Sequence, residues 1–427
     1  MYHNKIFFYI LNTSFYYLLV EVICGRIYRN GLTKACIGIE DGRIVKIKKN
    51  IDGKKKDYGD AIIFPAGIDV HVHFREPGYE YKEDFFTGSR ASAMAGVTCI
   101  LDMPNNKPAI LKKRDFEEKI RRVKNKACID YGMYAGIVGK EFDDMECIAY
   151  KIFLSRDNEI FCKIEKIKEI LEKVKEKNKA IAIHAEVEAC IKRGGARNLR
   201  EHERNREINC EIEAVKKIIK ANEKIKARVH ICHITSSKSV DLIKDKINFG
   251  VTLHHILFSY ESKFKYSAMG KVNPPLRSEE ERRRLFEKLI KGEVPIMESD
   301  HAPHLLEEKE DFAVSPSGMP GVDALLPIML YRAKKGEIDI NLLQRMVCSN
   351  PAEFFRINKG RIEIGKDADF IVVDFRKENK IKAFSKCGWT AYEGMKCIYP
   401  EYVYLRGEKI VENGEFIGEK GMGRMIK

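Results

Sequence analysis

The chain has 427 residues, of which 44% are hydrophobic and 33% charged, and its 77 Lys and Arg against 63 Asp and Glu give a formal net charge of +14. This composition supplies a large core and excludes a disordered chain, a coiled coil and a disulfide-stapled mini-protein. The positive charge lies on lysine-rich helical faces, and no basic run is interleaved with stacking aromatic residues, so we expect no nucleic-acid partner. The field would attract an anionic small molecule.

The first predicted element is an apolar stretch near the N-terminus. Residues 7–22 are rich in Phe, Tyr, Leu and Val, but polar residues at 12–14 interrupt them and Glu21 ends them. A membrane span requires about 20 uninterrupted apolar residues, so the pattern predicts no membrane segment. We interpret residues 1–17 as an extension that precedes an edge strand.

The rest of the chain divides into three parts by its hydrophobic pattern. Short alternating stretches broken by turns, with a hairpin signal at Asp41-Gly42, predict that residues 1–66 contribute to a small β-subdomain. In residues 67–356 apolar strands alternate with amphipathic helices, which is the pattern of a parallel sheet covered by helices. In residues 357–427 the short strands return. We therefore expect both chain ends to form one β-subdomain beside a central α/β barrel.

The cysteines predict the redox state of the protein. All twelve are scattered singly, without a C-x-x-C pair. This spacing favours reduced, mostly buried thiols in a cytoplasmic protein over a disulfide framework or a zinc ribbon.

Histidines mark the candidate site. His71 and His73 end a predicted strand, and residues two apart on a strand point to the same face, so both imidazoles can reach one ion. A packed histidine pair is the alternative from this pattern alone. His184, His233 and Asp300 follow three further predicted strands, and barrel active sites are built at such strand ends. Together these positions predict a metal centre.

Lys151 is the unusual member of this group. It lies within the apolar strand 146–154, where an uncompensated ammonium would be costly. A neutral amine can add carbon dioxide and become a carbamate, whose two oxygens can bridge two cations. A lysine paired with a buried carboxylate, or one that reaches the rim, is the alternative. With four imidazoles and Asp300 nearby, we favour the carbamate.

Seven motifs, in this order, resemble the dihydroorotase family of the amidohydrolase superfamily. They are His71-Val-His-Phe-Arg-Glu-Pro-Gly78, Asp102-Met-Pro-Asn-Asn106, Tyr150-Lys-Ile-Phe-Leu154, His184-Ala-Glu186, His230-Ile-Cys-His-Ile-Thr235, Lys271-Val-Asn-Pro-Pro-Leu-Arg277 and Ser299-Asp-His-Ala-Pro-His304. The resemblance spans residues 20–407. It implies a (β/α)₈ TIM-type barrel with a small β-sandwich from both chain ends.

The resemblance also implies a metal centre of two zinc ions per chain. His71, His73 and Asp300 would hold one ion, His184 and His233 the second, and N6-carboxylated Lys151 would bridge the two. The implied reaction is the reversible cyclisation of carbamoyl-aspartate to dihydroorotate in pyrimidine synthesis. In the hydrolytic direction, a metal-bridged hydroxide would attack the ring amide carbonyl, and Asp300 would shuttle the proton.

The implied substrate is an anion, so a carboxylate-binding group is expected. Arg75 can grip a carboxylate with two donors, although a rim ion pair with Glu76 or Glu80 is the alternative. The resemblance adds six further substrate-binding residues, namely His73, Asn105, Asn273, His304, Ser317 and Gly318. Asn105 could instead form an Asx turn beside Pro104.

One stretch departs from the family pattern. Relatives often read Glu-Val-Thr-Pro-His-His where this chain has Gly250-Val-Thr-Leu-His-His255, so a carboxylate is missing at residue 250 and no third metal contact is expected there. We interpret His254 and His255 as structural residues and Cys232 as a buried thiol.

Other functions are weighed against this one. Allantoinase and hydantoinase are the nearest rivals, but substrates without a carboxylate have little use for Arg75. A non-catalytic scaffold paralogue is the third reading, and such proteins usually lose metal histidines. The sequence leaves open whether the protein forms a homo-oligomer or associates with aspartate transcarbamoylase.

Overall fold

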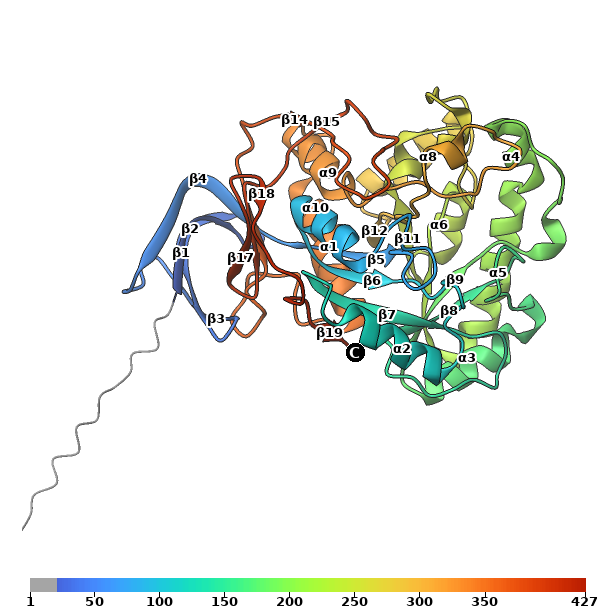
Figure 1. Cartoon of the computed structure of the whole chain (residues 1–427), viewed down its shortest axis with the longest axis horizontal. Coiled ribbons are helices and arrows are strands. Elements are labelled where there is room, and N and C mark those ends of the chain that lie inside the picture. The colour runs from blue at the N-terminus through green and yellow to red at the C-terminus, as the bar shows by residue number, and fades with distance from the viewer. Residues whose placement is uncertain (1–20) are drawn as a thin grey trace, which may run out of the picture.

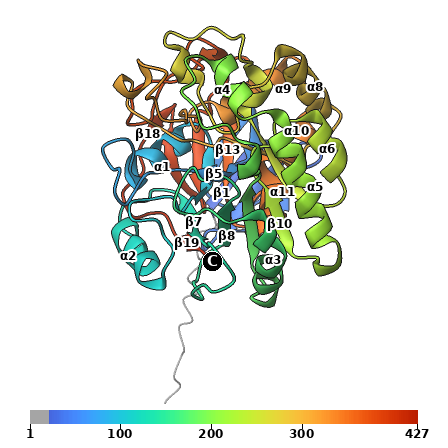
Figure 2. The same ribbon diagram turned by 90° about the vertical axis from the view of Figure 1, so that its right-hand side faces the viewer.

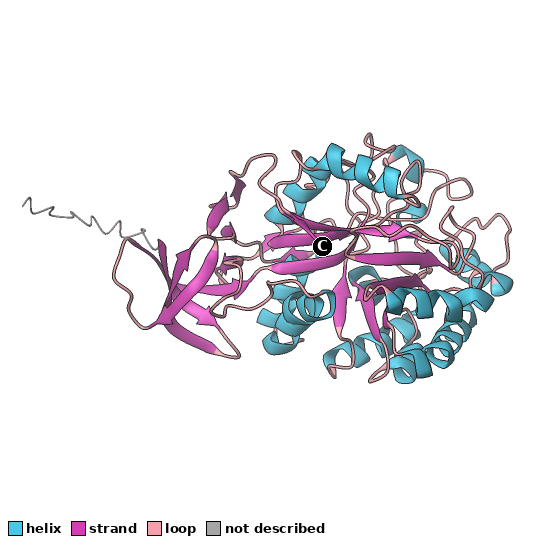
Figure 3. Cartoon of the chain, turned by 90° about the horizontal axis from the view of Figure 1, so that it is seen from below, coloured by secondary structure: helices cyan, strands magenta, loops and turns pink. Residues whose placement is uncertain are grey.

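The computed structural model describes residues 21–427, so the extension expected over residues 1–17 lies outside the described part. The chain forms a barrel beside a sheet built from both chain ends (Figure 1). Helices surround the barrel and are missing from the neighbouring sheet of residues 21–65 and 370–416, as the colouring by secondary structure makes plain (Figure 3). Within residues 21–427, each helix is too short or too polar to cross a membrane.

Eight parallel strands form the barrel in chain order. They are β5 (Gly67–Val72), β6 (Val97–Asp102), β7 (Asp130–Gly136), β8 (Ala149–Phe153), β9 (Ala180–His184), β10 (Arg228–Ile231), β11 (Asn248–Thr252) and β12 (Ile296–Glu298). The backbone N–H of His73 donates to the carbonyl of His301 at 2.8 Å and draws the first strand to the last. Most strand residues are buried, because side chains fill the interior and helices cover the outside. The predicted barrel is confirmed.

Helices surround the strands (Figure 2). They are α1 (Phe85–Met94), α2 (Lys113–Val123), α3 (Ile167–Glu176), α4 (Leu199–Asn205), α5 (Ile208–Ile225), α6 (Ser237–Ile243), α7 (Leu253–Leu257), α8 (Glu279–Ile290), α9 (Leu325–Lys334), α10 (Ile340–Gln344) and α11 (Asn350–Phe355). In α3, Ile167, Ile170, Leu171 and Val174 are buried while the lysines face solvent, as the period of the sequence predicts. Asp84 caps α1, where its carboxylate accepts the backbone N–H groups of Phe86 and Thr87.

The terminal sheet joins the two ends of the chain. Its strands are β1 (Glu21–Tyr28), β2 (Leu32–Glu40), β3 (Arg43–Lys48), β4 (Lys55–Pro65), β13 (Phe370–Val373), β16 (Tyr402–Leu405), β17 (Glu408–Glu412) and β18 (Glu415–Phe416). The central pairing is antiparallel, between β4 from one end and β13 from the other. Asp41 and Gly42 have φ angles of 49° and 76°, which is the left-handed backbone that a tight hairpin between β2 and β3 requires.

Three short strands lie outside this order. β14 (Asn379–Lys380) pairs with β15 (Lys396–Cys397), and β19 (Met425–Ile426) adds in parallel to the barrel strand β7. The last residues of the chain therefore extend the barrel sheet rather than the terminal sheet.

A buried ion-pair network fixes the terminal sheet to the amino end of the barrel. Lys359 Nζ lies 2.8 Å from Asp130 at the start of β7, 3.2 Å from Asp367 and 2.7 Å from Asp369. Burial would lower the pKa of Lys359, but the three carboxylates outweigh it and hold the pKa well above its usual range. Arg406 pairs with Asp130 from the other side. Each charged side chain of the network has a partner of opposite charge, so we assign the network a structural role.

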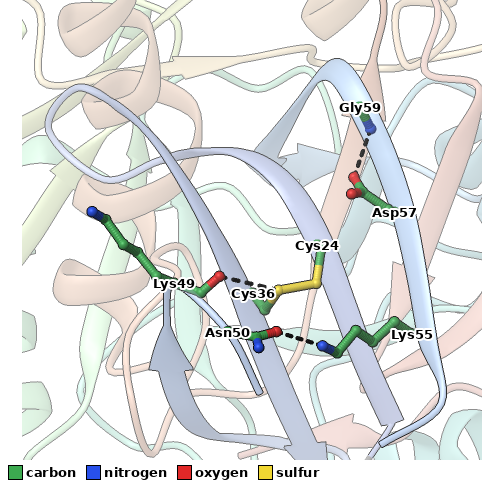
Figure 4. The surroundings of a disulfide bond; sticks show 7 residues. All are labelled: Cys24, Cys36, Lys49, Asn50, Lys55, Asp57 and Gly59. Carbon is green, nitrogen blue, oxygen red and sulfur yellow. Dashed lines mark hydrogen bonds between the residues drawn. A yellow bond between two sulfur atoms is a disulfide. The ribbon is translucent and has the colours of Figure 1, made fainter. Parts of the chain in front are cut away.

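The expectation that no cysteines pair is wrong at one position. Cys24 and Cys36 lie directly opposite each other on β1 and β2 and form a disulfide (Figure 4). The scattered spacing hid this pair because cross-strand neighbours are set by hairpin register and not by a short sequence interval. The other ten cysteines are free, and nine of them are buried, as predicted.

Candidate active site

The predicted site residues meet at the carboxyl ends of the barrel strands. They line a cavity of about 320 Å³. Ten of the twelve predicted residues are in its wall, namely His71, His73, Arg75, Asn105, His184, His233, Asn273, Asp300, Ser317 and Gly318. The other two, Lys151 and His304, lie directly behind the wall and contact wall residues. A larger groove of about 1070 Å³ between α3 and α5 contains only helix-surface residues, so we place the site in the smaller cavity.

The first group of potential metal ligands consists of Asp300 and two imidazoles that face it. Asp300 Oδ1 lies 3.3 Å from His71 Nε2 and 3.1 Å from His73 Nε2. Because His73 Nδ1 donates to Asn105 Oδ1 at 2.7 Å, and burial lowers the pKa of His73 to about 3, its Nε2 carries a lone pair. A lone pair and a carboxylate oxygen that face each other at this distance are favourable only with a cation between them. This arrangement fits a metal ion.

His184 and His233 form the second group. His184 Nε2 donates to Glu186 Oε2 at 2.7 Å, which leaves Nδ1 facing His233 Nε2 at 3.1 Å. Burial and the neighbouring His184 hold the pKa of His233 well below its usual value, so its ring is neutral and can act as a ligand. The ring centroids of His71 and His233 are 5.2 Å apart, and the two groups are therefore adjacent.

Asp300 is the ionised group of this cluster. Burial raises its pKa, but the adjacent His71 outweighs burial and holds the pKa well below its usual range. Its side chain is 10% exposed and faces the cavity, so a reactant can reach it. The residue lies two positions beyond the end of β12, in left-handed backbone at φ 45°.

Lys151 points into the barrel from β8 and is fully buried. Its Nζ contacts Cys232 Sγ at 3.0 Å and lies 4.7 Å from the Phe153 ring centroid. Within residues 21–427 no carboxylate lies within ion-pair distance of Lys151, so the paired lysine of the alternative interpretation is not seen. The amine is close to His71 and His233, which both contribute to the same group of potential ligands as Cys232.

Arg75 forms the opposite wall. Its Nε donates to the carbonyl of Pro303 at 3.1 Å, and Nη2 lies 3.1 Å from His304 Nε2. Glu76 pairs with Lys126 and Glu80 accepts the backbone N–H of Gly78, so neither forms the rim ion pair with Arg75. The backbone of Arg75 is left-handed at φ 64°, and its side chain lines the cavity.

A glycine loop closes the cavity above Arg75. The backbone N–H of Gly318 donates to the carbonyl of Lys271 at 2.8 Å, and a Cβ at Gly318 would lie 2.6 Å from the carbonyl oxygen of Ala302. With φ at 138° as well, only glycine fits. Asn273 accepts a hydrogen bond from His202 Nε2 at 3.0 Å, which orients its amide at the cavity.

Sequence reasoning assigned no role to several residues of the site. Arg206 donates hydrogen bonds to both Asp157 and Glu186. Glu186 in turn accepts from His184 and so fixes the orientation of that imidazole. Asp157 also lines the cavity. Glu186 could have been found, because it lies two residues after His184 and both can point the same way. Asp157 and Arg206 carry no comparable signal. His255 bonds Thr252 and the carbonyl of Pro274, in keeping with a structural residue.

The fold and this cluster define a class of protein. Imidazoles and a carboxylate at the carboxyl ends of a parallel barrel form groups that could hold a metal ion, with a buried lysine beside them, and such an arrangement is suited to hydrolysis. The chain belongs to the Amidohydrolase family, whose sequence profile matches residues 62–412.

Individual relatives agree with this assignment. The dihydroorotase of Methanosarcina acetivorans is 34% identical, over 94% of this chain and 93% of its own length. The dihydroorotase of Pyrococcus horikoshii is 36% identical, over 95% of both chains. Among solved structures, the L-hydantoinase of Arthrobacter aurescens superposes with a TM-score of 0.90 at 24% identity, over 95% of this chain and 99% of the other. The family resemblance that the motifs predict is confirmed.

Proposed function

We propose that the protein is a dihydroorotase, which catalyses the reversible cyclisation of N-carbamoyl-L-aspartate to L-dihydroorotate. The observation that carries this proposal is the position of Arg75, which places a guanidinium in the same cavity as the cluster of potential metal ligands. Relatives that are 34% and 36% identical over more than nine-tenths of the chain are named dihydroorotase, which supports the same reaction.

The proposed metal is zinc, with two ions per chain. His71, His73 and Asp300 would hold one ion, His184 and His233 the other, and carboxylated Lys151 would lie between them. Neutral imidazoles with carboxylate oxygen are the ligands that zinc prefers in proteins. When bound, the ions would supply an activated water and polarise the substrate carbonyl.

We assign proton transfer to one residue of the site and orientation of the imidazoles to two others. Asp300, ionised and open to the cavity, takes a proton from the attacking water and passes it to the departing ring nitrogen. In the cyclisation direction the transfers run in reverse. Glu186 and Asn105, through their bonds to His184 and His73, fix the imidazole tautomers and hold the ligand nitrogens toward the centre of the cavity.

Arg75 binds the substrate carboxylate. Its Nε donates to the carbonyl of Pro303, and this contact fixes the plane of the guanidinium before substrate arrives. Among residues 21–427 the Nη1 of Arg75 has no hydrogen-bond acceptor. A hydantoin or allantoin ring has no carboxylate for this group, which disfavours the rival activities.

The test is a substrate panel with metal-replete protein. We expect ring closure of carbamoyl-aspartate and ring opening of dihydroorotate, and no turnover of allantoin or of a 5-substituted hydantoin. Zinc per chain, measured on the same sample, separates an enzyme from a scaffold paralogue. Hydantoin opening without dihydroorotate opening would contradict the proposal.

The Arg75→Met variant tests the carboxylate contact. We expect KM for dihydroorotate to rise about 10- to 100-fold with a smaller change in kcat, because a charge-assisted hydrogen bond contributes about 1.5–3 kcal/mol. Steady-state kinetics provide the measurement, with zinc content as the control. An unchanged KM would remove Arg75 from the substrate site.

A further inference from the structure

Glu298 is a buried carboxylate to which the mechanism above assigns no task. It is the last residue of β12 and is fully buried inside the barrel. Its Oε1 accepts the backbone N–H of His233 at 2.5 Å and lies 3.5 Å from His71 Nδ1. Its Oε2 lies 3.2 Å from His230 Nε2. One side chain therefore contacts two segments that carry proposed metal ligands.

These contacts are made on the side away from the cavity. Since His71 Nε2 faces Asp300, its Nδ1 is the far nitrogen, and within the described residues it makes no hydrogen bond. A ligand histidine usually donates this far N–H to an outer acceptor, which fixes the ring rotation. Glu298 Oε1 faces this nitrogen at 3.5 Å and is the carboxylate oxygen within ion-pair distance of it.

The contact with His233 acts on the backbone. His233 has left-handed backbone at φ 36°, a conformation that costs free energy for a residue with a side chain. The hydrogen bond from its N–H to Glu298 Oε1 holds this turn in place. The imidazole of His233 depends on the turn for its direction.

Gly250 on β11 provides the space for this carboxylate. A Cβ at residue 250 would lie 2.5 Å from Glu298 Cδ and 2.7 Å from both of its carboxylate oxygens. The backbone of Gly250 is not left-handed, so the requirement for glycine is one of space and not of conformation. The side chains of residues 250 and 298 share one volume, which explains why residue 250 of this chain is glycine.

We propose that Glu298 is a positioning residue that orients His71 and His233 for metal binding, and that Gly250 is the space that admits it. The inference rests on the proposed metal centre. It goes beyond that centre by assigning the geometry of two ligands on β5 and after β10 to one carboxylate on β12.

The test measures zinc affinity by competition with a chelator, together with the visible spectrum of the Co²⁺-substituted protein. We expect Glu298→Gln to weaken zinc binding about 10- to 100-fold and to alter the Co²⁺ spectrum, as removal of an outer partner of a ligand histidine does. Gly250→Ala should weaken binding in the same direction although Glu298 is still present, because the added methyl displaces the carboxylate.

Two further variants separate positioning from general stability. Asp323→Asn alters another buried carboxylate, which bonds Ser385 and contacts no proposed ligand, so it should lower the melting temperature without changing zinc affinity. The double change Gly250→Glu with Glu298→Gly supplies a carboxylate from β11 instead, and it should recover part of the lost affinity.

The outcomes are distinct. If wild-type protein binds zinc and turns over dihydroorotate while Glu298→Gln and Gly250→Ala bind zinc as tightly as wild type with the same Co²⁺ spectrum, the inference about Glu298 is overturned and the proposed function stands. If wild-type protein binds no zinc, the metal centre and this inference both fail. If Glu298→Gln does not fold, Gly250→Ala still decides the question.

Discussion

Buried lysines at the two ends of the barrel have opposite surroundings. Lys359, at the amino end, lies within 3.2 Å of three carboxylates. Lys151, at the carboxyl end, contacts a thiol and an aromatic ring instead. Both side chains are almost fully buried. A buried lysine whose counter-charges are present has a structural role, whereas a buried lysine without a counter-charge, beside the imidazoles of the cavity, marks a place where a charged group can bind.

The largest expected effect is at Asp300, the charged residue of the carboxyl end. Asp300→Ala should lower kcat for dihydroorotate opening by about 10²- to 10⁴-fold, because the proton carrier and a proposed zinc ligand are lost together. Substrate binding should change little, which equilibrium dialysis with dihydroorotate would show. Activity close to wild type would refute the proton role.

Lys359 should affect stability instead. Lys359→Met leaves Asp130, Asp367 and Asp369 short of a counter-charge, and breaking a buried pair in this way costs about 3–5 kcal/mol. Urea unfolding would measure the loss. The protein that remains folded should turn over substrate at the wild-type rate. A loss of activity larger than the unfolded fraction explains would show that Lys359 also affects the active site.

Lys151 should show the reverse pattern. Lys151→Met keeps an apolar stem in the barrel and removes the amine, so we expect the melting temperature to hold while zinc content and activity fall, the activity by at least about 100-fold. Mass spectrometry of native wild-type protein should find one added carbon dioxide that is lost in the variant. If the melting temperature of Lys151→Met fell as far as that of Lys359→Met, Lys151 would have the same structural role as Lys359, and the contrast between the two lysines would be wrong.

The disulfide should have the smallest effect. Replacing Cys24 and Cys36 by serine removes a cross-link between neighbouring strands of the terminal sheet, and we expect a loss of about 2 kcal/mol in stability. Turnover should be unchanged, because the sheet lies at the other end of the barrel from the site. Unfolding with and without reductant provides the measurement, and the reduced wild type is the matched control.

The sequence was sufficient for the barrel and for the composition of the site. The strand ends that carry His71, His184, His233 and Asp300 are short apolar runs followed by a polar residue, and parallel strands bring such ends to one edge. The family resemblance, which rests on the order of the seven motifs, added Arg75 and the loop with Gly318 to the predicted site. The roles of these residues, the domain boundaries and any partner protein stay predictions.

The missed features depend on which strands are neighbours. Glu298 interacts with His71 and His233 across the barrel, and its space depends on Gly250 of the adjacent strand. The Cys24–Cys36 pair depends on hairpin register. Neither relation has a fixed sequence interval, so composition and periodicity could not show it.

The pairing of β4 with β13 has a consequence for synthesis on the ribosome. Pro65 lies opposite Phe370, and 370 − 65 gives a sequence separation of 305 residues between the two halves of this pairing. At about 5–20 residues per second, translation needs about 15–60 s to supply the second half. For that time the nascent chain carries an unpaired strand edge on β4, which is a template for association with other chains. A chaperone that shields β-edges should therefore raise the yield of this protein more than one that acts after release.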